Sequence, residues 1–223
     1  MKETLNRKYL LVVVIVVSLI IVAAAVSVSI EEQQSPADSG SVLHAVDVLP
    51  ESGDFGEGVE LSYGHIEDWE SVINSMNSPL LQGTMIGYNP EDRQMIEESN
   101  RKWISDTSEL LDHGVIDLAK VSYVLYDNSG EVSDLTSADI YAFNETEGAE
   151  WYLDKIVSGK SEEGSYMESV EGPWAEAFSP NSPWGGSDIY YVRCSNIVFS
   201  TFSTDGDLSR DMAEKIAGRV ALA

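Results

Sequence analysis

The sequence predicts an α+β domain in which β-hairpins form an antiparallel sheet covered by helices. Short runs of alternating apolar residues, separated by turn residues, are typical of antiparallel strands. The order strand, turn, strand, helix occurs twice, over residues 121–157 and again over residues 188–220. Because each helix must cover one face of the sheet, two ββα units of this kind belong to a mixed α+β domain.

An apolar segment precedes this domain. Residues 9–30 carry no charge. As a helix they span roughly 33 Å, which is enough to cross a hydrocarbon core of about 30 Å. Lys2, Arg7 and Lys8 precede the segment, and basic residues stay on the cytoplasmic side. We therefore expect a single-pass anchor in the cell membrane, preceded by a cytoplasmic N-terminus of residues 1–8. A cleaved signal peptide is the alternative, although its apolar region is usually only about 7–15 residues long.

The rest of the chain divides into a stalk and one extracytoplasmic domain. Residues 31–42 are polar, acidic and small, so they are predicted to form a flexible stalk. Residues 43–223 are enough for one globular domain with a substantial core. The single cysteine, Cys194, excludes an intramolecular disulfide and a zinc site of the CxxC type, and we expect it to be a packed thiol.

A strand and two helices are predicted at the start of the domain. The strand covers residues 58–65, and a short amphipathic helix over residues 66–76 follows it. The second helix is longer. Asn89 and Pro90 supply its N-cap and first helical position, and Gly114 predicts its end.

The two ββα units come next. Apolar residues alternate in each predicted strand, and the apolar residues of each helix lie on one face. Asp207 is predicted to cap the last helix. The predicted strands are residues 121–126, 139–143, 188–193 and 197–202, and the predicted helices are residues 147–157 and 207–220.

Between the two units, residues 158–187 are rich in Gly, Ser, Glu and Pro, and they are predicted to form a long irregular loop. This loop carries the candidate ligand-contacting aromatic residues Trp174, Phe178 and Trp184. Two interpretations stay open for these side chains. They either hold the loop against the core or form the rim of a ligand pocket.

The net charge of −25 excludes two classes of partner. Nucleic acids and anionic lipid surfaces would both be repelled. Residues 1–30 hold three of the 13 basic and one of the 38 acidic residues, which leaves 10 basic and 37 acidic residues in the exported part. Surface adaptation for solubility, divalent cation binding and a basic partner are three interpretations of this charge. The acidic residues 204–207 lack the length of a calcium loop and predict a turn.

No catalytic residue, cofactor site or metal site is predicted. His44, His65 and His113 do not have the spacing of a zinc motif, and His113 is expected to complement the dipole of the helix that ends beside it. Asn144 begins the one N-x-[ST] sequon without proline in the middle, so it is the candidate glycosylation site. The many carboxylates leave open an unidentified pair of the kind that glycosidases use.

Three short residue patterns in the C-terminal half carry a resemblance to known proteins. The strand ending at Phe143 leads to Ala149, Tyr152 and Leu153; Arg193 and Asn196 bound a short R-x-x-N turn; and residues 213–219 read A-x-x-I-A-x-R. In these patterns the chain from about residue 110 resembles exported PsbP-like lipoproteins and the extracellular sensor domains of bacterial serine/threonine kinases. The chain lacks their lipobox cysteine, their paired cysteines and any kinase domain.

The resemblance implies an exported module that binds a ligand or partner and catalyses nothing, and it supplies no binding residues. We therefore expect a membrane-anchored, non-catalytic binding domain whose partner is a small ligand or a protein. A cell-surface hydrolase that uses an unidentified carboxylate pair is the alternative.

Overall fold

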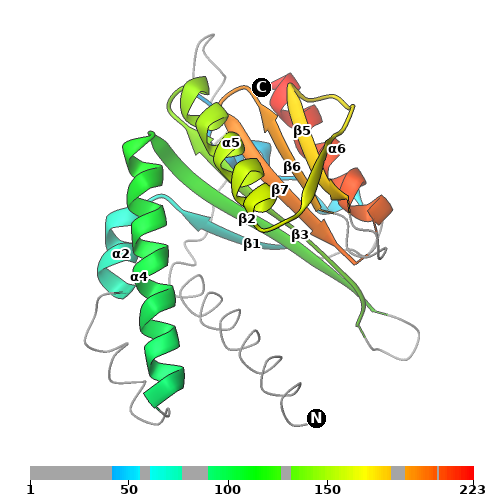
Figure 1. Ribbon diagram of the computed structural model, residues 1–223. Helices are drawn as coiled ribbons and strands as arrows, with labels where there is room; N and C mark the ends of the chain where they lie inside the picture. The colour runs from blue at the N-terminus through cyan, green and yellow to red at the C-terminus, as the bar shows by residue number, and fades with distance from the viewer. Residues whose placement is uncertain (1–41, 56–60, 77–89, 127–131, 182–188, 205) are drawn as a thin grey trace.

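The computed structural model describes residues 42–55, 61–76, 90–126, 132–181, 189–204 and 206–223. They form a seven-stranded antiparallel sheet with helices on both faces, in the strand order β1-β2-β3-β7-β6-β5-β4 (Figure 1). The predicted α+β class is confirmed. The elements are η1 (Ala45–Val48), η2 (Ser52–Asp54), β1 (Ser62–Ile66), α2 (Trp69–Met76), α4 (Pro90–Asp112), β2 (Val115–Tyr126), β3 (Val132–Phe143), α5 (Thr146–Glu162), β4 (Tyr166–Ser169), β5 (Glu176–Asn181), β6 (Ile189–Cys194), β7 (Ile197–Ser203) and α6 (Gly206–Leu222).

The two ββα units meet at the centre of the sheet. The first consists of β2, β3 and α5, and the second of β6, β7 and α6. The second strands of the two units pair with each other, with Ile140 opposite Phe199. Since both residues are fully buried, the centre of the sheet joins the units through apolar packing as well as hydrogen bonds.

Each face of the sheet has its own core. On one face, α6 and η1 pack over Ile140, Val192 and Phe199. On the other, α2, α4 and α5 pack over Leu118 and Phe143. The alternation of side chains along a strand explains this division, because neighbouring residues point to opposite faces.

The limits of α4 confirm the predicted start at Pro90 and the predicted end before Gly114, while the predicted N-cap Asn89 lies outside the described residues. The helix begins at Pro90, where a missing N–H costs no hydrogen bond, and it ends at Asp112. Gly114 follows with a φ of 77°, a conformation that side-chain-bearing residues rarely adopt. Its N–H donates to the carbonyl of Leu111. The helix therefore turns into β2 at the expected place.

The prediction of an irregular loop over residues 158–187 is wrong where the structure describes the end of α5 and the strands β4 and β5. Helix α5 continues to Glu162, and β4 and β5 then form a hairpin at the edge of the sheet. Proline is tolerated in β5 because the described pairing of β5 with β6 covers only Glu176, Ala177 and Phe178, so Pro180 pairs with β4 on one side alone. Both strands of the hairpin lack the apolar alternation by which a strand is recognised.

No helix within these described ranges is both long enough and apolar enough to cross a membrane. The predicted anchor at residues 9–30 and almost all of the predicted stalk lie outside the described residues.

Candidate functional site

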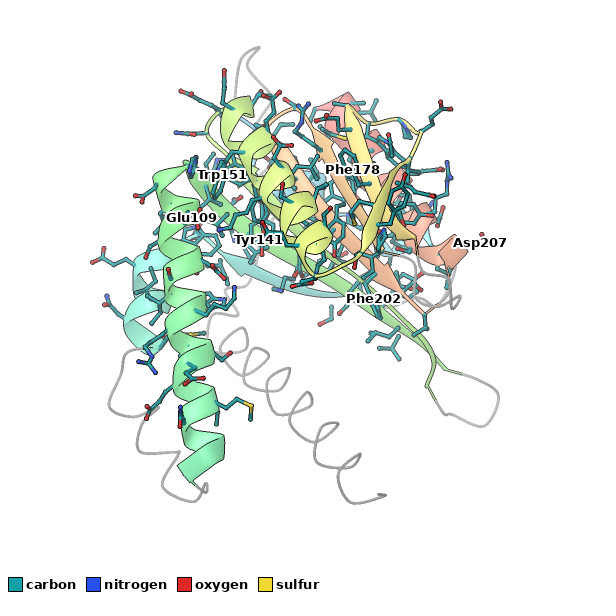
Figure 2. The ribbon with its side chains drawn as sticks, in the orientation of Figure 1. Glu109, Tyr141, Trp151, Phe178, Phe202 and Asp207 are labelled. Carbon is teal, nitrogen blue, oxygen red and sulfur yellow. The ribbon has the colours of Figure 1, made fainter. Side chains whose placement is uncertain are left out.

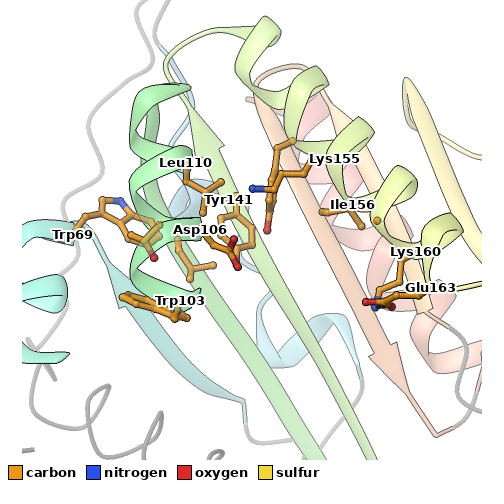
Figure 3. Close-up of a pocket in the computed structure, with 13 residues that line it drawn as sticks. Trp69, Trp103, Asp106, Leu110, Tyr141, Lys155, Ile156, Lys160 and Glu163 are labelled. Atoms are coloured by element: carbon orange, nitrogen blue, oxygen red, sulfur yellow. Dashed lines mark hydrogen bonds and ion pairs between the residues drawn. The ribbon is translucent and has the colours of Figure 1, made fainter. Parts of the chain in front are cut away.

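A groove lies between α4 and α5, on the face of the sheet that these helices cover (Figure 3). Its volume is about 340 Å³. The residues that α5 contributes recur at intervals of three and four, so they form one face of that helix. The groove is lined by Trp69, Trp103, Asp106, Thr107, Leu110, Leu118, Tyr141, Tyr152, Lys155, Ile156, Gly159, Lys160 and Glu163.

Four aromatic side chains give the groove its character. Trp69 is 5% exposed, and its indole N–H donates to the carbonyl of Ile116 at 3.0 Å, which fixes the ring. Trp103 of α4 lines the same end. The rings of Tyr141 and Tyr152 are 4.8 Å apart at a tilt of 59°, a favourable arrangement for two aromatic rings.

The tyrosine pair is neutral. Burial raises the pKa of Tyr141 well above its ordinary value, and the neighbouring tyrosine adds to this effect. Burial also raises the pKa of Tyr152, to about 12, despite its hydrogen bond with Tyr141. Since both hydroxyl groups keep their protons at neutral pH, the floor of the groove offers aromatic faces and hydroxyl groups but no charge.

The charged side chains of the groove are already paired. The Lys155 ammonium group forms an ion pair with Glu109 and lies 5.1 Å from the centre of the Trp151 ring. Figure 2 shows Glu109 and Trp151 on the facing helices. Lys160 is 2.9 Å from Glu163. Each lysine of the groove therefore has a carboxylate partner that offsets its charge, and the Lys160–Glu163 pair is the more exposed of the two, at 40% and 67%.

Asp106 is the other carboxylate that lines the groove. It is bound to Lys102 at 2.6 Å, but Lys102 is 77% exposed and belongs to the outer surface of α4. An exposed pair of this kind contributes only about 0–1 kcal/mol and is screened by salt. The Asp106 carboxylate therefore remains able to attract a cation at the aromatic end of the groove.

A second candidate site lies on the opposite face, where β2 has an irregularity. Val115 pairs with Phe143 and Asp117 pairs with Ala142, so Ile116 is an extra residue in β2. This bulge lets Val115 and Leu118 face the same core, while Asp117 points to the other face. The bulge thereby places the Asp117 carboxylate next to His44 and Ala45, at the start of the domain.

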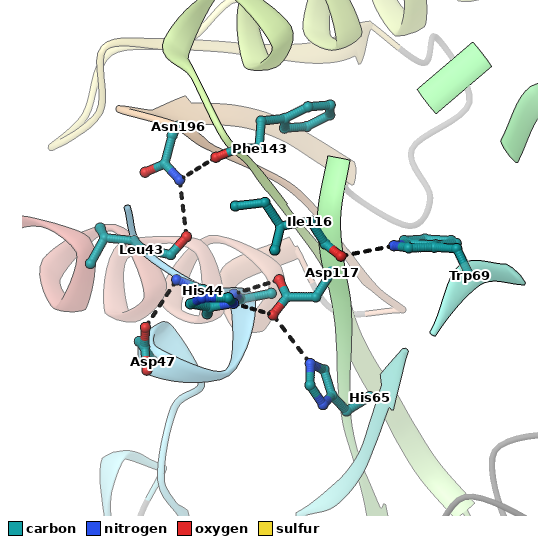
Figure 4. Close-up of polar contacts among 10 residues, drawn as sticks. Leu43, His44, Asp47, His65, Trp69, Ile116, Asp117, Phe143 and Asn196 are labelled. Carbon is teal, nitrogen blue, oxygen red and sulfur yellow. Dashed lines mark hydrogen bonds and ion pairs between the residues drawn. The ribbon is translucent and has the colours of Figure 1, made fainter. Parts of the chain in front are cut away.

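The carboxylate of Asp117 lies within hydrogen-bonding distance of three nitrogen atoms (Figure 4). Its Oδ2 atom lies 2.9 Å from His44 Nδ1 and 3.2 Å from His65 Nε2. Its Oδ1 atom accepts the backbone N–H of Ala45 at 2.9 Å. The side chain of Asp117 is only 2% exposed, whereas the imidazoles of His44 and His65 are 51% and 28% exposed. We call these three residues the Asp117 cluster.

The contacts in the Asp117 cluster shift two pKa values in opposite directions. The hydrogen bond with Asp117 raises the pKa of His65 although burial opposes it, and the negative charges of Asp117 and Glu67 raise it further. Burial would raise the pKa of Asp117, but hydrogen bonds from His65, the Ala45 N–H and His44 together lower it. The cluster therefore favours a histidinium next to a carboxylate.

The predicted aromatic residues of the loop do not come together. Trp174 packs against the core under α6, and its indole N–H donates to the carbonyl of Val170 at 2.8 Å. Phe178 lies in β5 and packs on the other face of the sheet (Figure 2). Trp184 lies outside the described residues. Trp174 and Phe178 thus contact the two separate cores.

Three other residues singled out in the sequence, Asn144, His113 and Cys194, lie away from both candidate sites' central contacts. Asn144 is exposed between β3 and α5, where an attached glycan would meet solvent. His113 stacks on Trp151 with ring centres 3.6 Å apart, a contact that the sequence did not predict. Cys194 is buried, and burial raises the pKa of its thiol to about 11, so it is a packed thiol as expected.

The acidic surface gives no metal site among the residues that the structure describes. No three side chains of His, Cys, Asp or Glu there form a group able to hold a metal ion. The predicted cap at Asp207 is wrong, because α6 begins at Gly206 and Asp207 is the second residue of the helix, where a carboxylate complements the helix dipole.

Both candidate sites escape detection in the sequence. The groove combines residues of α4 and α5 that are about 50 positions apart, and the predicted α5 ended before Gly159 and Lys160.

Compared with family models, curated proteins and solved structures, the chain matches none of them.

Proposed function

We propose that this chain is a membrane-anchored extracytoplasmic domain that binds a cationic organic ligand, without catalysis, in the groove between α4 and α5. The ligand class proposed is an alkylammonium compound with an apolar body. The observation that carries the proposal is a groove lined by four aromatic side chains whose two lysines are both held by carboxylates. The apolar segment at residues 9–30 supports the anchor.

Charge complementarity favours a cation over an anion. The faces of aromatic rings carry negative potential and attract alkylammonium groups. Asp106 adds a carboxylate beside Trp103 at one end of the groove. The exported part of the chain holds 37 acidic and 10 basic residues, so its long-range field also attracts cations and repels anions.

The proposal gives the groove no catalytic role. Its two carboxylates, Asp106 and Glu163, lie at opposite ends (Figure 3), and each is paired with a lysine. A glycosidase needs two carboxyl groups on either side of one bond. The hydrolase alternative therefore has no support in this groove.

The test compares choline with 3,3-dimethylbutan-1-ol, which has the same shape but no charge. The full chain in mild detergent is titrated with each compound, and tryptophan fluorescence is measured because Trp69 and Trp103 line the groove. A desolvated cation–π contact contributes about 2 kcal/mol, so we expect choline to bind roughly 30-fold more tightly. Equal affinity for the two compounds would contradict the proposal.

The Asp106→Asn variant tests the carboxylate. We expect choline binding to weaken about three- to fivefold, as for the loss of a partly exposed charge, while the neutral compound binds unchanged. Asp211→Asn is the matched control, because Asp211, like Asp106, pairs with a lysine four residues away in its own helix, but on α6. An identical loss in both variants would show a field effect of the whole surface instead of recognition in the groove.

A further inference from the structure

The chain enters the domain through contacts to buried polar groups. The Asn196 amide donates to the carbonyl of Leu43 at 2.9 Å and to that of Phe143 at 2.7 Å. Ala45 donates its N–H to Asp117 and is itself fully buried, as is Val48 of η1. Residues 43–48 are therefore fastened to the sheet before the first strand begins.

The edge strand β1 is fastened to the same carboxylate. In the described part of the sheet β1 pairs with β2 alone, so it has one neighbour instead of two. His65 of β1 reaches the Oδ2 atom of Asp117, the atom that His44 also contacts. One buried carboxylate thus links two elements, η1 and β1, that are otherwise 10 or more residues apart in the chain.

Two further carboxylates lie near the histidines of the Asp117 cluster. Asp47 of η1 accepts the backbone N–H of His44, and Glu67 faces His65 from the end of β1. A neutral imidazole donates to Asp117 in only one tautomer, whereas an imidazolium always donates and adds a charge. Protonation of His65 therefore strengthens its contact with Asp117.

We propose that the Asp117 cluster is a pH-dependent attachment, which ties β1 to residues 43–48 more firmly in mildly acidic surroundings and less firmly as the pH rises. The direction follows from linkage. A group whose pKa is higher in the folded state contributes stability that is fully present below its unfolded pKa, about 6.5 for histidine. That contribution is lost as the pH rises through the folded-state value.

Asp117 sets the acid limit of the attachment. Its pKa is lowered in the folded state, so its contribution is present above the unfolded value, about 3.9, and disappears as the pH falls through the folded value. The attachment is therefore strongest between these two limits. For a domain outside the membrane, the pH of the surroundings would then set how firmly its first elements are held.

Hydrogen exchange of the full chain in detergent tests this proposal. Protection of the backbone amides is measured in peptides covering residues 43–48 and 62–66 from pH 5.5 to pH 8, after correction for the intrinsic exchange rate. We expect protection to fall with rising pH, by about tenfold for each unit by which the folded-state pKa of His65 exceeds its unfolded value. Peptides of β3 and β7 report on global opening and should change less.

The His65→Gln variant separates the titration from the hydrogen bond, because glutamine donates to Asp117 but does not titrate near neutral pH. We expect the pH dependence in both peptides to flatten. His113→Gln is the control, since His113 stacks on Trp151 and does not contact Asp117. If His65→Gln keeps the full pH dependence of the natural chain, the proposal is wrong. Choline affinity is measured in parallel, so failure of the attachment is distinguishable from failure of the groove.

Discussion

Phe199→Ala lowers the free energy of unfolding by about 4 kcal/mol, within the usual range for a phenylalanine deleted from a core. Phe199 is fully buried and lies opposite Ile140 on one neighbouring strand and Val192 on the other. Helix α6 covers it with Met212 and Ile216. A truncation here leaves a cavity between two layers that cannot close without moving both. Urea denaturation followed by circular dichroism measures the loss.

The control for this prediction is Phe202→Ala, three residues later in the same strand. Phe202 is only partly buried and points to the other face of the sheet. We expect this variant to lose about 1–2 kcal/mol, because less apolar area leaves water on folding. If both variants lost the same free energy, the assignment of Phe199 to the centre of the core would be wrong.

Gly159→Trp weakens choline binding by at least tenfold in affinity. A Cβ atom at Gly159 would meet nothing within 4 Å, so the position has room for a side chain, and that room is the groove. Tryptophan also has a higher helix propensity than glycine, so α5 is not weakened. Titration by calorimetry measures the affinity independently of the added tryptophan.

Gly218→Trp is the matched control for this variant. Gly218 lies in α6 on the opposite side of the sheet, and a Cβ atom there also meets nothing within 4 Å. We expect it to bind choline as the natural chain does. Normal binding by Gly159→Trp would mean that the ligand binds elsewhere, whatever the charge of the groove.

Sequence patterns predicted the elements whose limits depend on local chemistry. Pro90 and Gly114 bound α4 because each acts on the backbone at its own position. The hairpin of β6 and β7 was predicted because alternating apolar residues flank a tight turn, in which Ser195 has a φ of 54°. Both signals are contained in a few consecutive residues.

The hairpin of β4 and β5 was missed for the opposite reason. Met167 pairs with Pro180, and Ser169 with Phe178, so its strands contain few apolar residues in alternation. Backbone hydrogen bonds to β6 hold β5, and the segment between β4 and β5 is held by the hydrogen bond from the Trp174 indole to the carbonyl of Val170. Those bonds depend on a strand that the chain adds later, which no local pattern shows.

The candidate sites depend on tertiary structure even more strongly. Asp117 meets His44 only because the bulge at Ile116 turns its side chain toward η1. In the sequence the two histidines of the cluster are 21 residues apart and have no motif spacing. Tyr152 was predicted to lie on the core face of its helix, and it packs there. Trp103, which lines the same groove, comes from a helix that was predicted separately.

The pairing of β3 with β7 has a consequence for biosynthesis. As the polypeptide leaves the ribosome, β2, β3 and α5 are complete about 35 residues before the first residue of β7 is made. During that interval β3 presents a full row of unsatisfied N–H and C=O groups, the arrangement that recruits foreign strands. A nascent chain of this protein is thus most prone to aggregation just before β7 emerges. A chaperone that holds the unfinished chain would have its greatest benefit at that stage.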